Sequence, residues 1–225
     1  MIIDFEKVLR LYTRKDIQES IVALAKDREV AVRYGQGGYG KRPDTLLYPS
    51  DVLEFIKTGV TSFHVSEERW SNPLEIQTGM QRKELDNIRI GWDCVLDIDS
   101  PYIEYSQITA NLILEALKFN GIKSAGIKFS GNHGFHIILP FEAFPKQVGG
   151  KETRLLFPEG PRRIANYLNY IIEEKLAQKI LEKNTLQEIS KATKKPLEEL
   201  ASKKNGIQPF KLVDIDTLLI SSRHL

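Results

Sequence analysis

The chain has 225 residues, of which 41% are hydrophobic, and its 32 basic and 30 acidic side chains leave a net charge of +2. This balance excludes a uniformly basic protein, so any basic binding site must be local. The single cysteine, Cys94, excludes an internal disulfide and any zinc site that needs two or more thiolates. No stretch approaches the roughly 20 apolar residues of a membrane span, so we expect neither secretion nor membrane insertion, but a reducing, cytoplasmic setting.

The N-terminal third predicts short helices, two strands and one loop. Residues 2–26 have helical spacing, with Asp16 as a plausible cap before Ile17, and a short strand, "REVAVRY", follows them. The next stretch, "GQGGYGKRPD", contains Arg42 and is too rich in glycine for regular structure. A helix, "DVLEFIKTG", then leads into an alternating strand, "VTSFHVSEERW". The glycine-rich loop is thus expected to be mobile and basic, and its Arg42, with Arg33 and Lys41, is a candidate template contact.

The central block predicts a strand, a helix and two further strands. These are "WDCVLDID", "SQITANLILEALKFNG", "SAGIKF" and "FHIILP". A β-α-β-β series of this kind is typical of an α/β or α+β core.

Helices dominate the last part of the chain. From Pro161 an apolar face recurs at helical spacing, and Thr185 and Glu188 form a capping box at the start of a later helix. We interpret residues 161–205 as a lysine-rich helical insertion in one domain that spans residues 1–225. A final strand, "PFKLVDIDTLLI", precedes the end at "SSRHL", where the chain stops within apparent structure and so looks truncated.

Two aspartates lie on one face of the central acidic strand. Side chains alternate along a strand, so Asp97 and Asp99 share a face, with Cα atoms roughly 7 Å apart. Paired carboxylates suit a hard cation, although for this pattern alone two ordinary aspartates at a solvent-facing strand end are the more common explanation. Asp214 and Asp216 in the late strand repeat the spacing. Carboxylates from two strands can together hold two Mg²⁺ or Mn²⁺ ions.

The turn "KFSGNHGFH" joins the two later strands of the central block. Lys128 and Ser130 share a face of the incoming strand, and His136 lies on the outgoing strand. Gly131 and Gly134 allow a sharp turn with exposed N–H groups. Such donors suit a triphosphate, whereas a plain hairpin with a half-buried histidine is the alternative.

Taken in order, three segments resemble the catalytic small subunit of archaeal and eukaryotic replicative primases. They are "GWDCVLDIDSP", "KFSGNHGFHIIL" and "VDIDTLLISSRHL". The resemblance to this archaeo-eukaryotic primase superfamily covers about residues 60–140 and 210–225. It implies an α+β fold, with a mixed or antiparallel sheet flanked by helices.

The resemblance also implies roles for individual residues. Asp97 and Asp99 match two metal ligands. The family's third aspartate lies nine positions before an arginine, which here is Arg223 and selects Asp214, with Asp216 as the fallback. The implied nucleotide-binding residues are those of the turn and this arginine: Lys128, Ser130, Gly131, Asn132, His133, Gly134, His136 and Arg223.

Within the turn, Ser130 and His136 carry the strongest expectation, because they match the family's triphosphate-contacting serine and histidine. Asn132 and His133 stand where some relatives have basic residues, and His133 at the tip equally suits an exposed histidine with no ligand.

Two features depart from the family pattern. Replicative primases usually carry a cysteine-rich zinc knuckle, which one cysteine cannot build, so no structural zinc is expected. Family members also continue beyond the position of "RHL" to a basic run with a nucleotide-holding histidine, whereas this chain stops at Leu225.

The resemblance therefore predicts a DNA primase-like nucleotidyltransferase that makes RNA or DNA primers from NTPs or dNTPs with two Mg²⁺ or Mn²⁺ ions. Its expected partners are single-stranded DNA and a primase large subunit, in the cytoplasm at the nucleoid. One alternative is a stand-alone primase-polymerase in repair, end joining or plasmid replication. Another is a nucleic-acid-binding relative without catalysis.

Overall fold

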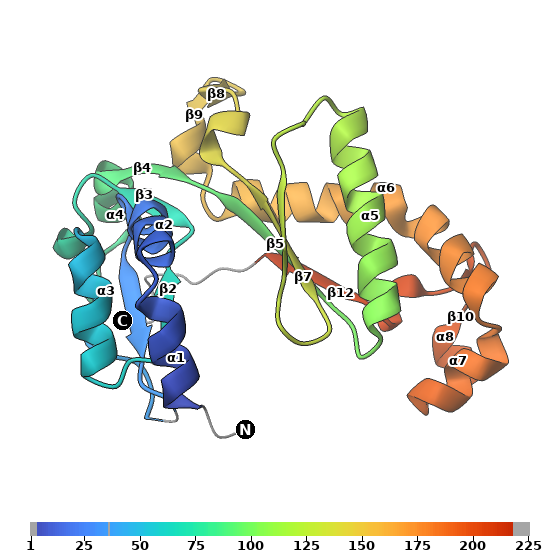
Figure 1. Cartoon of the computed structure of the whole chain (residues 1–225). Helices are drawn as coiled ribbons and strands as arrows, with labels where there is room; N and C mark the ends of the chain where they lie inside the picture. The colour runs from blue at the N-terminus through green and yellow to red at the C-terminus, as the bar shows by residue number, and fades with distance from the viewer. Residues whose placement is uncertain (1–3, 36, 218–225) are drawn as a thin grey trace. The chain divides into compact units, whose positions relative to one another are not determined.

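The computed structural model describes residues 4–35 and 37–217 and divides the chain into two compact units (Figure 1). One unit reaches to Trp92 and the other begins at Asp93. Both combine helices with antiparallel strand pairs, so the chain has an α+β fold. In the part of the chain described, no helix combines the length and apolar character needed to cross a bilayer.

The first unit contains two strand pairs and four α-helices. Strand β1 pairs with β2, and β3 pairs with β4, both antiparallel. Its elements are α1 (Phe5–Tyr12), α2 (Lys15–Ala25), β1 (Val30–Arg33), α3 (Pro49–Lys57), β2 (Ser62–Val65), β3 (Glu68–Trp70), η1 (Pro73–Glu75), α4 (Arg82–Ile88) and β4 (Arg89–Trp92). The predicted cap at Asp16 is wrong: α2 has Arg14 at its N-cap, and Asp16 in the first turn accepts two hydrogen bonds from that guanidinium.

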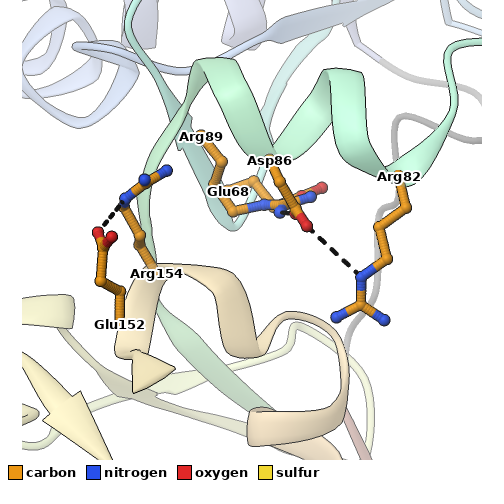
Figure 2. A network of polar contacts seen from close by, with 6 residues as sticks. All are labelled: Glu68, Arg82, Asp86, Arg89, Glu152 and Arg154. Carbon is orange, nitrogen blue, oxygen red and sulfur yellow. Dashed lines mark hydrogen bonds and ion pairs between the residues drawn. The ribbon is translucent and has the colours of Figure 1, made fainter. Parts of the chain in front are cut away.

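Glu68, a buried carboxylate of the first unit, is paired with an arginine (Figure 2). The Arg89 guanidinium donates to Glu68 at 2.7 Å and to Asp86, and it lies 5.3 Å from the centre of the Trp70 ring. Arg89 and Glu68 are each 2% exposed, whereas Arg82 reaches Asp86 at 3.7 Å from a more exposed position. A buried carboxylate is tolerated here because an arginine neutralises it and supplies its hydrogen bonds.

The second unit is built on a four-stranded antiparallel sheet in the order β12-β5-β7-β6. Figure 1 shows helices α5 and α6 beside this sheet. The elements of the unit are β5 (Cys94–Asp99), α5 (Ile103–Phe119), β6 (Gly126–Phe129), β7 (Phe135–Leu139), η2 (Phe141–Ala143), β8 (Gln147–Val148), β9 (Lys151–Glu152), η3 (Thr153–Leu156), α6 (Glu159–Lys183), α7 (Leu186–Thr193), α8 (Leu197–Leu200), β10 (Ala201–Ser202), β11 (Gly206–Ile207), η4 (Pro209–Lys211) and β12 (Asp214–Thr217). An ion pair between Glu152 and Arg154 follows β9 (Figure 2).

One face of the sheet is apolar and is covered by helices. Along β5, Cys94, Leu96 and Ile98 are fully buried and alternate with more exposed side chains. Helix α5 packs on β5 and β7, α6 packs on β12 and β5, and the two helices contact each other. Burial raises the pKa of the Cys94 thiol to about 12, and the charge of Asp93 adds to this effect. The opposite face of the sheet is therefore the one available for chemistry.

The predicted helical insertion has two different parts. Helix α6 belongs to the core, because its residues Leu168, Ile172 and Leu176 are buried. Helices α7 and α8 form a smaller peripheral segment, and α7 begins with the predicted capping box, which is confirmed. The peripheral segment then leads through β10 and β11 to η4 and β12.

Candidate functional site

Four polar side chains line up across the open face of the sheet. Asp97 on β5 is opposite Asp216 on β12 and opposite His136 on β7, and His136 is opposite Lys128 on β6. Directly opposed residues of antiparallel strands project from the same face. The structure thus brings three predicted segments together in one row, although they are far apart in the sequence.

A second row lies next to the first, toward the ends of the strands. Asp99 is opposite Asp214, and beyond it Gly134 and Ser130 close the hairpin. The Ser130 N–H donates to the Gly134 carbonyl at 3.0 Å, and the Gly134 N–H donates to Ser130 Oγ at 3.1 Å. The Ser130 hydroxyl is thereby held toward the row, and its own hydrogen remains available to a ligand.

Gly134 is needed for steric reasons. A Cβ atom at this position would overlap the Asp99 carboxylate and the Ile98 carbonyl oxygen. Gly131 has a different reason, since its φ of +98° lies in the left-handed region that favours glycine. The two glycines of the motif therefore serve separately, one for packing against the acidic strand and one for the turn.

Asp97 is the most perturbed carboxylate of the site. Its side chain is 24% exposed, and its Oδ1 atom is buried without a hydrogen bond, 3.3 Å from His136 Nε2. Burial raises the pKa of Asp97, and the charges of Asp99, Asp214 and Asp216 raise it further, whereas His136 acts in the opposite direction. A carboxyl group with these neighbours gains most from an added cation.

No lysine or arginine of the described ranges forms an ion pair with any of the four aspartates. Carboxylate oxygens from two strands, one of them buried and unbonded, are the type of ligand that Mg²⁺ and Mn²⁺ prefer. As placed, no three His, Cys, Asp or Glu side chains among residues 4–35 and 37–217 are grouped closely enough to hold a metal ion. An ion would have to draw the carboxylates together by rotation of their side chains.

The tip of the hairpin is open. Asn132 and His133 are exposed, and both line a pocket beside Asp99 and Asp214. Lys128 on β6 is also exposed, and the structure gives it no ion pair within the ranges it describes. The predicted residue Arg223 lies outside the described residues.

Two of the three proposed template contacts in the first unit, Arg33 and Arg42, have other partners. The Arg42 guanidinium donates to both carboxylate oxygens of Glu29 at 2.6 Å, and Glu29 is 1% exposed. Arg33 lies 5.9 Å from the centre of the Tyr39 ring. Arg42 therefore has a structural role as the counterion of a buried acid.

One wall of the site consists of residues that the sequence patterns did not predict. Lys195, Phe210 and Lys211 line the pocket beside Asp99 and Asp214. Phe210 and Lys211 precede the "VDID" strand by a few residues, and this closeness is the signal that could have identified them. Lys195 carries no such signal, because α8, β10 and β11 lie between it and the residues that precede the strand.

Comparisons with known proteins add little about function. No protein-family model matches the chain. An uncharacterized protein of Methanocaldococcus jannaschii is 28% identical over 146 residues, which make up 63% of this chain and 30% of that protein. The chain thus matches less than a third of its relative's length.

Proposed function

We propose that the chain is a primase-type nucleotidyltransferase, which synthesises primers from NTPs or dNTPs on a single-stranded DNA template. One observation carries the proposal: the acidic strand, the SGxxGxH hairpin and the late aspartate strand contribute adjacent rows on one open sheet face. Carboxylates beside phosphate-binding donors are what two-metal nucleotidyl transfer requires. The four-stranded sheet with α5 and α6 behind it is compatible with a primase-polymerase core.

In this proposal Asp97, Asp99 and Asp214 hold the metal ions, and Asp216 is the fallback for the third ligand. Bound Mg²⁺ or Mn²⁺ would supply positive charge to the triphosphate and lower the pKa of the attacking 3′-hydroxyl. The 3′-oxygen then bonds to the α-phosphorus, the bond from that phosphorus to the bridging oxygen breaks, pyrophosphate leaves, and the hydroxyl proton passes to solvent.

The hairpin positions the nucleotide. The Ser130 hydroxyl and the His136 imidazole can donate hydrogen bonds to phosphate oxygens, and Lys128 contributes charge from the adjacent strand. His136 also stands between the aspartates and Lys128, so it can contact a phosphate that the metal ions neutralise. Phosphoryl transfer depends chiefly on such positioning and charge compensation.

A stand-alone primase-polymerase is the second candidate. Cys94 is the one cysteine of the chain and is buried in the sheet, so it cannot serve a surface zinc knuckle of the replicative type. The first candidate implies a primase large subunit and a location at the nucleoid, whereas the second needs no such subunit. Primer synthesis from free nucleotides, compared with gap filling on pre-paired ends, separates the two.

The test is a primer-synthesis assay with labelled NTPs and dNTPs on single-stranded DNA, with Mg²⁺ or Mn²⁺. We expect Asp97→Asn to lower the rate by about 100- to 1,000-fold, the loss typical when one group that stabilises transition-state charge is removed. Glu174→Gln removes an exposed carboxylate from α6 and should leave the rate unchanged. Undiminished synthesis by Asp97→Asn would falsify the assignment, and Asp214→Asn against Asp216→Asn identifies the third ligand.

A further inference from the structure

A pocket of about 620 Å³ opens beside the acidic rows, within the second unit. One side is formed by Asp99 and Asp214, and another by the hairpin tip at His133. The remaining wall comes from Lys195, which lies between α7 and α8, and from Phe210 and Lys211 in η4. We call this hollow the Lys211 pocket. Its volume is in the range of sites that bind small ligands such as one nucleotide.

The two lysines of this pocket differ in their contacts. Lys195 Nζ donates to the Lys211 carbonyl oxygen at 2.7 Å and lies 3.8 Å from Glu199, so it holds η4 in place. Lys211 has no ion pair and no side-chain hydrogen bond in the described part of the chain. Its ammonium group is therefore available for an anionic ligand.

Phe210 adds a second type of contact. Its ring is 37% exposed and lines the same pocket, next to Lys211. An exposed aromatic ring beside a free ammonium group is the combination that binds single-stranded nucleic acids, through base stacking and phosphate contact. The opposite wall of the pocket is acidic, because it is formed by Asp99 and Asp214. A suitable ligand therefore has its phosphate far from these two residues and a neutral hydroxyl group next to them.

A second pocket adjoins the Lys211 pocket at the hairpin tip. This adjoining pocket of about 450 Å³ shares Pro101 and His133 with the Lys211 pocket and is lined by Tyr102 and Tyr105. Glu104 and Glu188 line this part, and Glu104 forms an ion pair with Lys183 at 3.1 Å. The adjoining pocket therefore adds space beside His133, whereas the available ammonium group for a phosphate is that of Lys211.

We infer that the Lys211 pocket binds the 3′-terminal nucleotide of the strand that is extended, an inference that rests on the proposed function. The triphosphate donors Ser130, His136 and Lys128 lie on the β6 and β7 side of the aspartates, whereas η4 leads into β12. In-line displacement requires the attacking hydroxyl and the leaving pyrophosphate on opposite sides of the phosphorus. The terminal base then stacks on Phe210, its 5′-phosphate contacts Lys211, and its 3′-hydroxyl reaches Asp99 and Asp214.

The experiment measures primer extension with the 225-residue chain, varying the template-primer and the incoming nucleotide separately. The double variant Phe210→Ala, Lys211→Ala should raise KM for the template-primer about 10- to 100-fold, because a stacking and a phosphate contact are both lost. KM for the incoming nucleotide and kcat at saturating primer should not change. Lys118→Ala, Phe119→Ala is the matched control, since this Lys-Phe pair at the end of α5 is exposed and lines neither of the two pockets.

An unchanged primer KM, or an equal rise in the control, overturns the inference. A rise confined to the KM of the incoming nucleotide overturns it too, because the pocket would then bind the incoming nucleotide and not the primer. Lys211→Gln alone is the second variant if the double variant does not fold, and it should raise the primer KM several-fold.

Absence of extension by the wild type would contradict the proposed function, and binding then tests the pocket separately. The probe is a 5′-labelled single-stranded oligonucleotide followed by fluorescence anisotropy at several salt concentrations. Weaker binding by the double variant, with a salt slope reduced by about one, supports a nucleic-acid site. Equal binding by wild type and double variant overturns it.

Discussion

In the first unit the buried carboxylates of Glu29 and Glu68 each face an arginine, whereas four aspartates of the second unit share one sheet face without one. The nearest basic group to the buried Oδ1 of Asp97 is His136, and their contact is not a hydrogen bond. The first arrangement neutralises each acid within the chain. The second leaves four acids without a lysine or arginine partner in the ranges the structure describes.

This difference separates carboxylates that are paired within the fold from carboxylates that are crowded together without a basic partner. A buried acid paired with arginine contributes to stability only while both partners are present. Acids crowded on one face repel one another and raise the free energy of the unliganded protein, so such clusters are typical of functional sites. Four experiments test this difference between the two units.

The largest stability effect is expected at Arg89. Replacement by alanine removes the guanidinium that neutralises the buried Glu68 carboxylate, so the free energy of unfolding should fall by about 3–5 kcal/mol. Urea denaturation followed by circular dichroism measures the loss. Arg82→Ala is the control, because its contact with Asp86 is longer and more exposed and should contribute less than about 1 kcal/mol. A loss at Arg89 no larger than at Arg82 would mean that the buried pair is not structural.

The next effect concerns metal binding at Asp97. Mn²⁺ at a hundred times its dissociation constant should stabilise the wild type by about 2.7 kcal/mol, since a ligand that binds only the folded state shifts the equilibrium by mass action. Asp97→Asn should gain much less, and Glu174→Gln should gain as much as the wild type. Thermal unfolding with and without Mn²⁺ measures the three shifts, and equal shifts would contradict a metal site at Asp97.

Without a bound metal ion the charged Asp97 carboxylate destabilises the folded protein, and the dependence of stability on pH measures this effect. The pKa of Asp97 is raised in the folded protein, so stability falls as pH rises from the ordinary value of 3.8 through the raised value and stays lower above both. Asp97→Asn removes this fall. The variant should therefore be more stable than the wild type at neutral pH, and its advantage should shrink below pH 3.8.

The smallest effect is expected at Gly134. An alanine Cβ would overlap the Asp99 carboxylate, so Gly134→Ala should destabilise the chain by about 1–3 kcal/mol, as overpacking usually does. It should also lower activity by displacing Asp99. Gly126→Ala on β6 is the matched control, since its Cβ would meet only ordinary contacts at 3.9 Å and it should be near neutral. Equal stability of the two variants would show that the hairpin can shift away from the acidic strand.

Local patterns predicted much of the second unit. The alternation along "CVLDID" identifies the apolar and acidic faces of β5, because a half-buried strand must obey a period of two. The capping box at Thr185 was also predicted, since it depends on residues three apart. The register of β12 on β5 could not be predicted, because all the elements from α5 to η4 lie between the two strands in the sequence.

The candidate site shows the same limit. The sequence indicated Asp97, Asp99, Ser130 and His136, but not that Asp216 rather than Asp214 is directly opposite Asp97. Arg42 looked like a free basic residue because its counterion, Glu29, lies earlier in the chain. No local pattern links the two residues. Pairings over long sequence separations depend on tertiary packing, which no short motif records.

Cys94 gives this sheet a built-in chemical reporter. Its thiol is fully buried behind the acidic strand, and its raised pKa keeps it protonated and unreactive while the strand is in place. As the sole cysteine of the chain, it can be alkylated only when β5 separates from the helices that cover it. The labelling rate with a maleimide therefore measures how often the acidic face of the sheet loses the helices behind it, without any engineered probe.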